Sequence, residues 1–114
     1  MAGYEVTTET HPGGRGGIVT VTGELDIAAV PAVSHAVAAL ESGSPPHLVL
    51  DLSGVVHLDS SGLRVLLDAS ARAGREGRRL VIVAPPDGPV GRLLELTLLA
   101  EHLDVVRDLD AACP

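Results

Sequence analysis

Two adjacent serines, Ser60 and Ser61, are the residues of this chain whose type and spacing could support a chemical reaction. They lie in the run Asp59-Ser60-Ser61-Gly62, which directly follows Leu58. A serine hydroxyl can act as a nucleophile, or it can accept a phosphoryl group. The nucleophilic elbow of serine hydrolases needs a glycine two residues before the serine, and Leu58 and Asp59 occupy those positions here. No spacing pairs a histidine with either serine, so serine hydrolysis is the less favoured alternative and no catalytic residue is assigned.

The same run has the composition of a helix start. Aspartate, serine and glycine are residue types preferred at the N-cap of a helix. After them, residues recur on one face with the period of a helix, at Leu63, Leu66, Leu67 and Ser70. A helix is therefore expected to begin at Ser60 and to end between Gly74 and Gly77.

A phosphate on Ser60 would suit the start of this helix. It would add nearly two negative charges and three strong acceptors, and the amides and dipole of a helix N-terminus favour an anion. Asp59, and Asp26 from the preceding strand-to-helix loop, would strengthen the negative field, so a docking partner would meet both bulk and charge. The alternative is that Asp59 and Ser60 only cap the helix. The spacing alone leaves both interpretations open.

Composition narrows the class of function. The formal net charge is −7 and Tyr4 is the only aromatic residue, which argues against nucleic acid as a partner. The chain contains no lysine, which removes the phosphate-loop lysine, the Ser-Lys dyad and Schiff-base chemistry. The five histidines show no ligand spacing and Cys113 is the only cysteine, so no metal site, disulfide or cofactor is predicted.

The sequence shows no membrane or export signal. No apolar run approaches the ~20 residues of a membrane span, and the N-terminus lacks a basic-then-apolar signal pattern. We therefore expect a cytoplasmic protein without a membrane partner.

Strand and helix patterns alternate along the 114 residues, which indicates one α/β domain over residues 1–114. A glycine-rich turn at 11–17 joins the first two strands into a hairpin. The sheet is expected to be mostly parallel, with about five strands and an antiparallel strand at the N-terminus. Three main helices should lie largely on one face, followed by a short C-terminal turn, in the order ββαβαβαβ. The expected strands are 4–10, 18–22, 47–52, 80–84 and 103–106, and the expected helices are 28–41, 60 to 74–77 and 87–97, with the turn at 108–112.

Two further expectations concern charged and polar side chains. His57 is interpreted as a partly buried packing residue at the end of a strand. Four arginines near the end of the central helix are interpreted as a solvated helix end, and less as a site for an acidic partner, and Arg72 and Arg75 in the last turns complement the helix dipole. These arginines are Arg72, Arg75, Arg78 and Arg79.

Three stretches carry a family resemblance. Asp51-Leu52-Ser53-Gly54-Val55 followed by Leu58-Asp59-Ser60-Ser61-Gly62-Leu63 closely resembles the signature of STAS domains, specifically the bacterial anti-sigma-factor antagonists. Gly23-Glu24-Leu25-Asp26-Ile27, before Pro31, resembles the second-strand motif of that family. The resemblance covers nearly the whole chain in the same order of elements, and it implies a STAS-like fold.

The resemblance also implies a binding protein that is a kinase substrate. In such proteins the first serine of the motif, here Ser60, is phosphorylated by an anti-sigma factor of the histidine-kinase-like ATPase class. The unphosphorylated form binds that anti-sigma factor and frees the sigma factor, and a metal-dependent serine phosphatase restores it. By position, Asp59 flanks the phosphosite, Ser61 helps to cap the helix, Gly62 completes the switch loop and Asp26 lies in the neighbouring loop.

The chain departs from the family pattern at His57, a position that is usually aromatic. The family also contains members without sigma-factor partners, namely scaffolds of stress-signalling complexes and domains attached to transporters. The scaffold, not switched at Ser60, is therefore kept as an alternative function, although such scaffolds usually carry an extra N-terminal domain.

Overall fold

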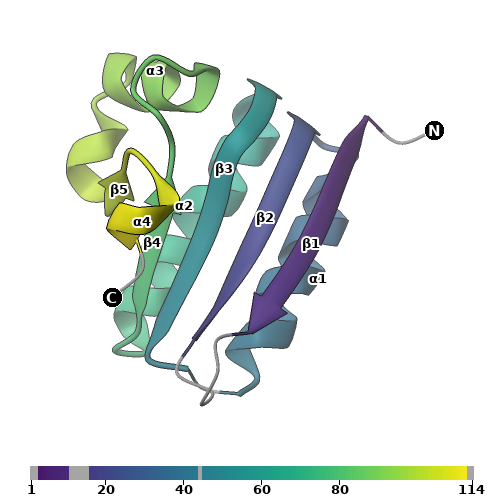
Figure 1. Ribbon diagram of the computed structural model, residues 1–114, viewed down its shortest axis with the longest axis vertical. Coiled ribbons are helices and arrows are strands. Elements are labelled where there is room, and N and C mark those ends of the chain that lie inside the picture. The colour runs from purple at the N-terminus through teal and green to yellow at the C-terminus, as the bar shows by residue number, and fades with distance from the viewer. Residues whose placement is uncertain (1–2, 11–15, 44, 113–114) are drawn as a thin grey trace.

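The chain forms a five-stranded sheet in the order β1-β2-β3-β4-β5, with helices on both faces (Figure 1). The computed structural model describes residues 3–10, 16–43 and 45–112. β1 is antiparallel to β2, and β2 to β5 are mutually parallel, which confirms the predicted topology. The strands are β1 (Tyr4–Thr10), β2 (Gly16–Leu25), β3 (His47–Leu58), β4 (Arg79–Val83) and β5 (Val105–Val106). The helices are α1 (Val30–Glu41), α2 (Ser60–Arg75), α3 (Pro89–Leu96), a 3-10 turn (Leu99–His102) and α4 (Leu109–Ala112).

Two of the expectations fall wholly or partly outside the described residues. They are the glycine-rich turn, of which 11–15 are not described, and Cys113. Among the helices that are described, none is long and apolar enough to cross a membrane.

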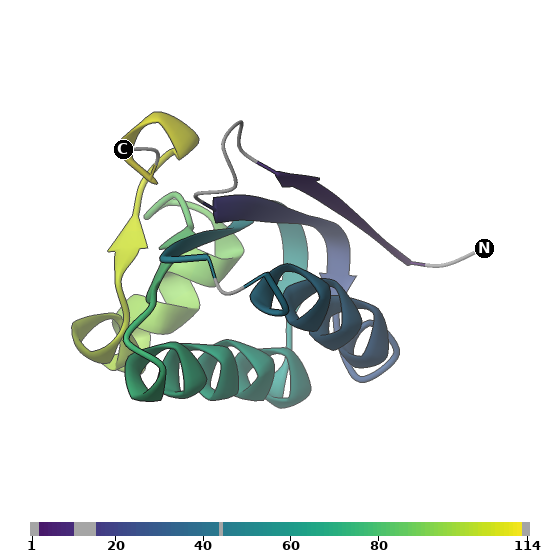
Figure 2. The same ribbon diagram turned by 90° about the horizontal axis from the view of Figure 1, so that it is seen from below.

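The main core lies between the sheet and the three larger helices. Figure 2 shows α1 and α2 beneath the sheet and the short α4 on its opposite side. α3 joins the same core as α1 and α2 through Val90 and Leu94. Because side chains alternate along a strand, Leu48 and Leu50 of β3 face this core, whereas Val49 packs with Ala112 of α4 on the other face.

β2 and β3 run further than the sequence predicts. β3 continues to Leu58 and β2 to Leu25, and these two leucines are paired in the parallel register. Ser53-Gly54 has the composition of a turn, but Gly54 lies within β3, where a Cβ would be 2.7 Å from Cγ2 of Thr22. The prediction that the strand ends at residue 52 was therefore wrong, because close packing of β2 on β3 needs the glycine there.

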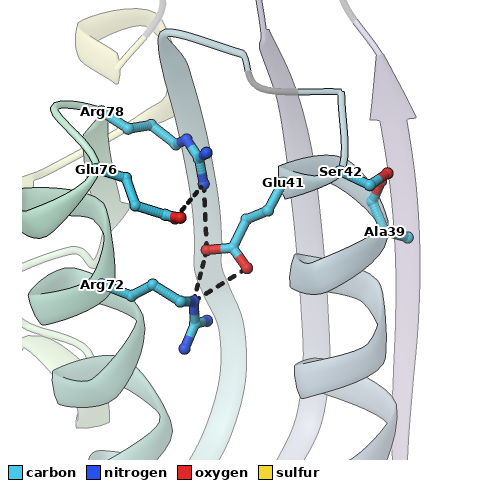
Figure 3. A network of polar contacts seen from close by, with 6 residues as sticks. All are labelled: Ala39, Glu41, Ser42, Arg72, Glu76 and Arg78. Carbon is cyan, nitrogen blue, oxygen red and sulfur yellow. Dashed lines mark hydrogen bonds and ion pairs between the residues drawn. The ribbon is translucent and has the colours of Figure 1, made fainter.

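The arginines at the end of α2 are not all solvated, which corrects the sequence interpretation. Arg72 Nε lies 2.8 Å from Oε2 of Glu41, at the end of α1, and Arg78 Nη1 lies 3.4 Å from the same oxygen (Figure 3). The Arg78 side chain is only 8% exposed and also lies 3.2 Å from Glu76 Oε1. Glu41 therefore joins the C-terminal ends of α1 and α2.

Candidate functional site

The strand-to-helix junction lies at the ends of the neighbouring strands β2 and β3 (Figure 1), where the backbones pack closely. The Asp59 amide donates to the Leu25 carbonyl oxygen over 3.4 Å. A Cβ on Gly62 would lie 2.3 Å from the same carbonyl oxygen and 2.5 Å from Leu58 Cδ1. Only glycine fits at this contact, so the first turn of α2 rests directly on the end of β2. This contact sets the position of Ser60.

Asp59 is the N-cap of α2. Its Oδ1 accepts hydrogen bonds from the amides of Ser61 at 2.9 Å and Gly62 at 3.1 Å, while its backbone is extended. The Asp59 carbonyl oxygen accepts from the Leu63 amide at 3.0 Å, which closes the first helical turn. A carboxylate here also meets the positive end of the helix dipole, so the cap contributes about 1 kcal/mol to stability.

Asp26 holds the loop that leads into α1, although it is not the N-cap of that helix. Its Oδ1 accepts from the amides of Ala28 at 3.1 Å and Ala29 at 3.3 Å. The carboxylate thus fixes the loop that follows β2, and the next residue, Ile27, is left 75% exposed. Because Leu25 is paired with Leu58, this loop lies beside the start of α2.

Ser60 is the first residue of α2, and its side chain is exposed. Within the described residues, neither the Ser60 hydroxyl nor the Ser61 hydroxyl makes a hydrogen bond to a histidine or to any other protein group. The side chain that caps the helix is that of Asp59, and Ser61 takes part through its backbone amide. The Ser60 hydroxyl is therefore free of a capping role and open to solvent.

His57 is exposed, which contradicts the expectation of a partly buried residue. The register of β3 on β2 shifts by one residue here, between the pairs Gly23–Val55 and Glu24–His57, and Val56 and His57 are both exposed while Val55 and Leu58 are buried. The exposed fraction of Val56 is 69%. Val56 and Ile27 are thus two large apolar side chains that face solvent within two residues of the Leu25–Leu58 pair.

Two hollows adjoin the start of α2. The larger, of about 610 Å³, lies between α1 and α2, and Ile27 and Ser61 are among the residues that line it. The smaller, of about 400 Å³, is lined by Ser60, Leu63, Arg64, Leu67 and Asp68. Arg64 lines both hollows. Sequence reasoning missed Arg64, although its spacing of four residues from Ser60 on a helix was a usable signal.

The part of the chain that the structure describes contains no cluster of three or more side chains suited to a metal ion. The junction instead combines the exposed hydroxyl of Ser60, two carboxylates that hold backbone amides, and exposed apolar side chains. These groups can present a surface to another protein, and they can accept a phosphoryl group.

Comparison with known proteins agrees with this picture. A family model described as "Mlab, STAS domain" matches residues 11–107. The anti-sigma-F factor antagonist RsfB of Mycobacterium tuberculosis is 33% identical over 70 residues, which are 61% of this chain and 56% of that protein. The aligned region thus spans about half the length of this curated relative.

Solved structures extend the likeness over nearly the whole chain. An anti-sigma factor antagonist from Mycobacterium paratuberculosis superposes with a TM-score of 0.82 at 33% identity, covering 96% of this chain and 90% of that one. The anti-sigma factor antagonist SpoIIAA in its unphosphorylated form superposes with a TM-score of 0.72, covering 94% of this chain and 92% of that one. Its identity of 17% supports the fold alone.

Proposed function

This chain belongs to the STAS-domain family, and on that premise we propose that it is an anti-sigma-factor antagonist controlled by phosphorylation of Ser60. The names of the relatives at 33% identity support the first part of this proposal. The unmodified chain would bind an anti-sigma factor and so free a sigma factor. The phosphorylated chain would release it.

The observation that carries the proposal is the exposed, uncommitted hydroxyl of Ser60 at the first position of a fixed helix. Its oxygen can attack the γ-phosphorus of ATP. The bond between that phosphorus and the β,γ-bridging oxygen breaks, a bond from Ser60 Oγ to phosphorus forms, the hydroxyl proton leaves and ADP departs. The kinase we propose is the anti-sigma factor itself, of the histidine-kinase-like ATPase class. A metal-dependent serine phosphatase would hydrolyse the ester.

Phosphorylation would change the surface of the protein and leave its fold in place. Two amides at the N-terminus of the helix that could bind the phosphate already donate to Asp59, that of Ser61 at 2.9 Å and that of Gly62 at 3.1 Å. A phosphate on Ser60 therefore stays outside the cap and places its charge beside an existing carboxylate. An acidic group at this end of the helix is compatible with the helix dipole, so the helix persists while the surface charge rises.

The exposed apolar side chains supply the attractive part of the surface. Ile27 and Val56 lie close to the Leu25–Leu58 pair, at the same end of the sheet as Ser60. A partner that covers them would bring Ser60 into its interface. Burying a phosphate dianion there would cost several kcal/mol unless the partner provided a matching cation.

The test is transfer of labelled phosphate from γ-labelled ATP by each anti-sigma-type ATPase of the source organism. We expect label on the wild-type chain and on Ser61→Ala, and none on Ser60→Ala. Ser61→Ala is the matched control because it removes a neighbouring hydroxyl from the same turn. Label on Ser60→Ala, or no label with any of these kinases, would contradict the proposal.

A further inference from the structure

Arg64 is a cation within one helical turn of Ser60 that is held only weakly. Its side chain is 83% exposed, and its Nε lies 4.0 Å from Oδ2 of Asp68. We infer that Arg64 is the phosphate receptor of this chain: once Ser60 is phosphorylated, Arg64 leaves Asp68 and pairs with the phosphate. This inference rests on the proposed phosphorylation of Ser60.

Two of the helix amides nearest to a phosphate at this position are already occupied. The Ser61 and Gly62 amides are engaged by Asp59, whose carboxylate repels a second anion. Three of the other arginines are paired elsewhere: Arg72 and Arg78 contact Glu41, and Arg79 lies 2.9 Å from Asp104. Arg64 is the arginine that shares a hollow with Ser60.

Helix geometry favours the exchange of partners. Residues four apart on a helix lie on the same face, so both Ser60 and Asp68 are within reach of Arg64. At this spacing a pair stabilises the helix more when the acid precedes the base in the sequence. Phosphoserine 60 with Arg64 has this favourable order, whereas Arg64 with Asp68 has the reverse order. The phosphate also carries nearly twice the charge of a carboxylate and offers three acceptor oxygens.

The exchange would alter the surface that a partner meets in two ways. Phosphorylation adds negative charge at Ser60, and it also withdraws the positive charge of Arg64 from its exposed position. Arg64 and Ile27 both line the larger hollow, between α1 and α2. Both changes therefore occur at the end of the molecule where we place the partner. If a carboxylate of the bound protein pairs with Arg64 in the unmodified complex, phosphorylation of Ser60 would remove the Arg64 guanidinium from that carboxylate and add a phosphate nearby.

The test needs no kinase, because phosphoserine can be introduced at position 60 during translation by amber suppression. The phosphate is then titrated by ³¹P NMR in the full chain, in Arg64→Gln and in Arg75→Gln. Arg75→Gln is the matched control, since it removes the same charge from the far end of the same helix. Asp59 opposes ionisation of the phosphate in all three proteins and does not affect the comparison.

We expect the pKa of the phosphate to be lower in the wild type than in Arg64→Gln by a few tenths of a pH unit, because Arg64 favours the dianion. Arg75→Gln should match the wild type. Equal titration midpoints in the wild type and Arg64→Gln would overturn the inference, and so would an equal change in Arg75→Gln. The outcome is independent of the proposed function, which fails separately if no kinase labels Ser60.

Discussion

Replacing Gly62 by alanine tests the contact that positions the candidate site. A Cβ there would lie 2.3 Å from the Leu25 carbonyl oxygen, 2.5 Å from Leu58 Cδ1 and 2.8 Å from Leu25 Cγ. The closest of these atoms is backbone in a paired strand, which cannot move without disturbing the sheet. Over-packing of this kind costs about 1–3 kcal/mol. Alanine regains up to about 1 kcal/mol of helix propensity over glycine. Because the contact of 2.3 Å is with a backbone atom, the cost lies at the upper end of that range, and the net expectation for Gly62→Ala is a loss of about 2 kcal/mol.

Gly74 gives a matched control on the same helix. No atom lies within 4 Å of the position that its Cβ would take, and its φ is not positive. Gly74→Ala should therefore leave the free energy of unfolding unchanged or raise it by up to about 1 kcal/mol. Urea unfolding followed by circular dichroism measures both variants against the wild type. At about 4 °C per kcal/mol, thermal midpoints should move in opposite directions.

The comparison of the two glycines can fail clearly. If Gly62→Ala were as stable as Gly74→Ala, the first turn of α2 would not rest on Leu25, and the placement of Ser60 would be wrong. If both variants lost stability equally, the loss would reflect a general intolerance of α2 to substitution and not the contact at Gly62.

Three further predictions use equilibrium unfolding with paired variants. Glu41→Gln should lose about 1–3 kcal/mol because it removes the carboxylate that Arg72 and the buried Arg78 share and leaves Arg78 with Glu76 alone, whereas Asp104→Asn, in an exposed pair, should lose less than about 1 kcal/mol. Asp59→Ala should lose about 1 kcal/mol and Asp59→Asn almost nothing, since asparagine caps a helix as well as aspartate does. Leu98 has a φ of 60° and is 64% exposed, so Leu98→Gly should keep or gain up to about 1 kcal/mol, while Leu96→Gly in α3 should lose about that amount. Equal effects within any pair would refute the corresponding argument.

The order of elements could be predicted because apolar periodicity reports strands and helices directly. Leu48, Leu50 and Leu66 follow such patterns and all are buried. The ends of the long strands could not be predicted in the same way. Ser53-Gly54 has turn composition, and only the tertiary contact of Gly54 with Thr22 shows why a glycine lies inside β3.

Local signals were sufficient for Asp59 at the candidate site but not for the ion pairs at the other end of α2. A cap is a local property, and Asp59 does hold the amides of α2. The pairing of Arg72 with Glu41 joins residues 31 positions apart, so no local pattern revealed it. The exposure of His57 likewise depends on the shift in register between β2 and β3 at this point, which the sequence of one strand does not specify.

The most direct test of the account is the affinity of the partner ATPase for the full chain carrying either serine or phosphoserine at position 60. Isothermal titration calorimetry with the ATPase that phosphorylates Ser60 measures the affinities of both forms. The account predicts that phosphoserine raises the Kd by at least about tenfold, which corresponds to about 1.4 kcal/mol, while Ser60→Ala binds like the unmodified chain. Equal affinity of the serine and phosphoserine forms would contradict a switch at Ser60 and would favour a scaffold whose binding ignores the charge at this position.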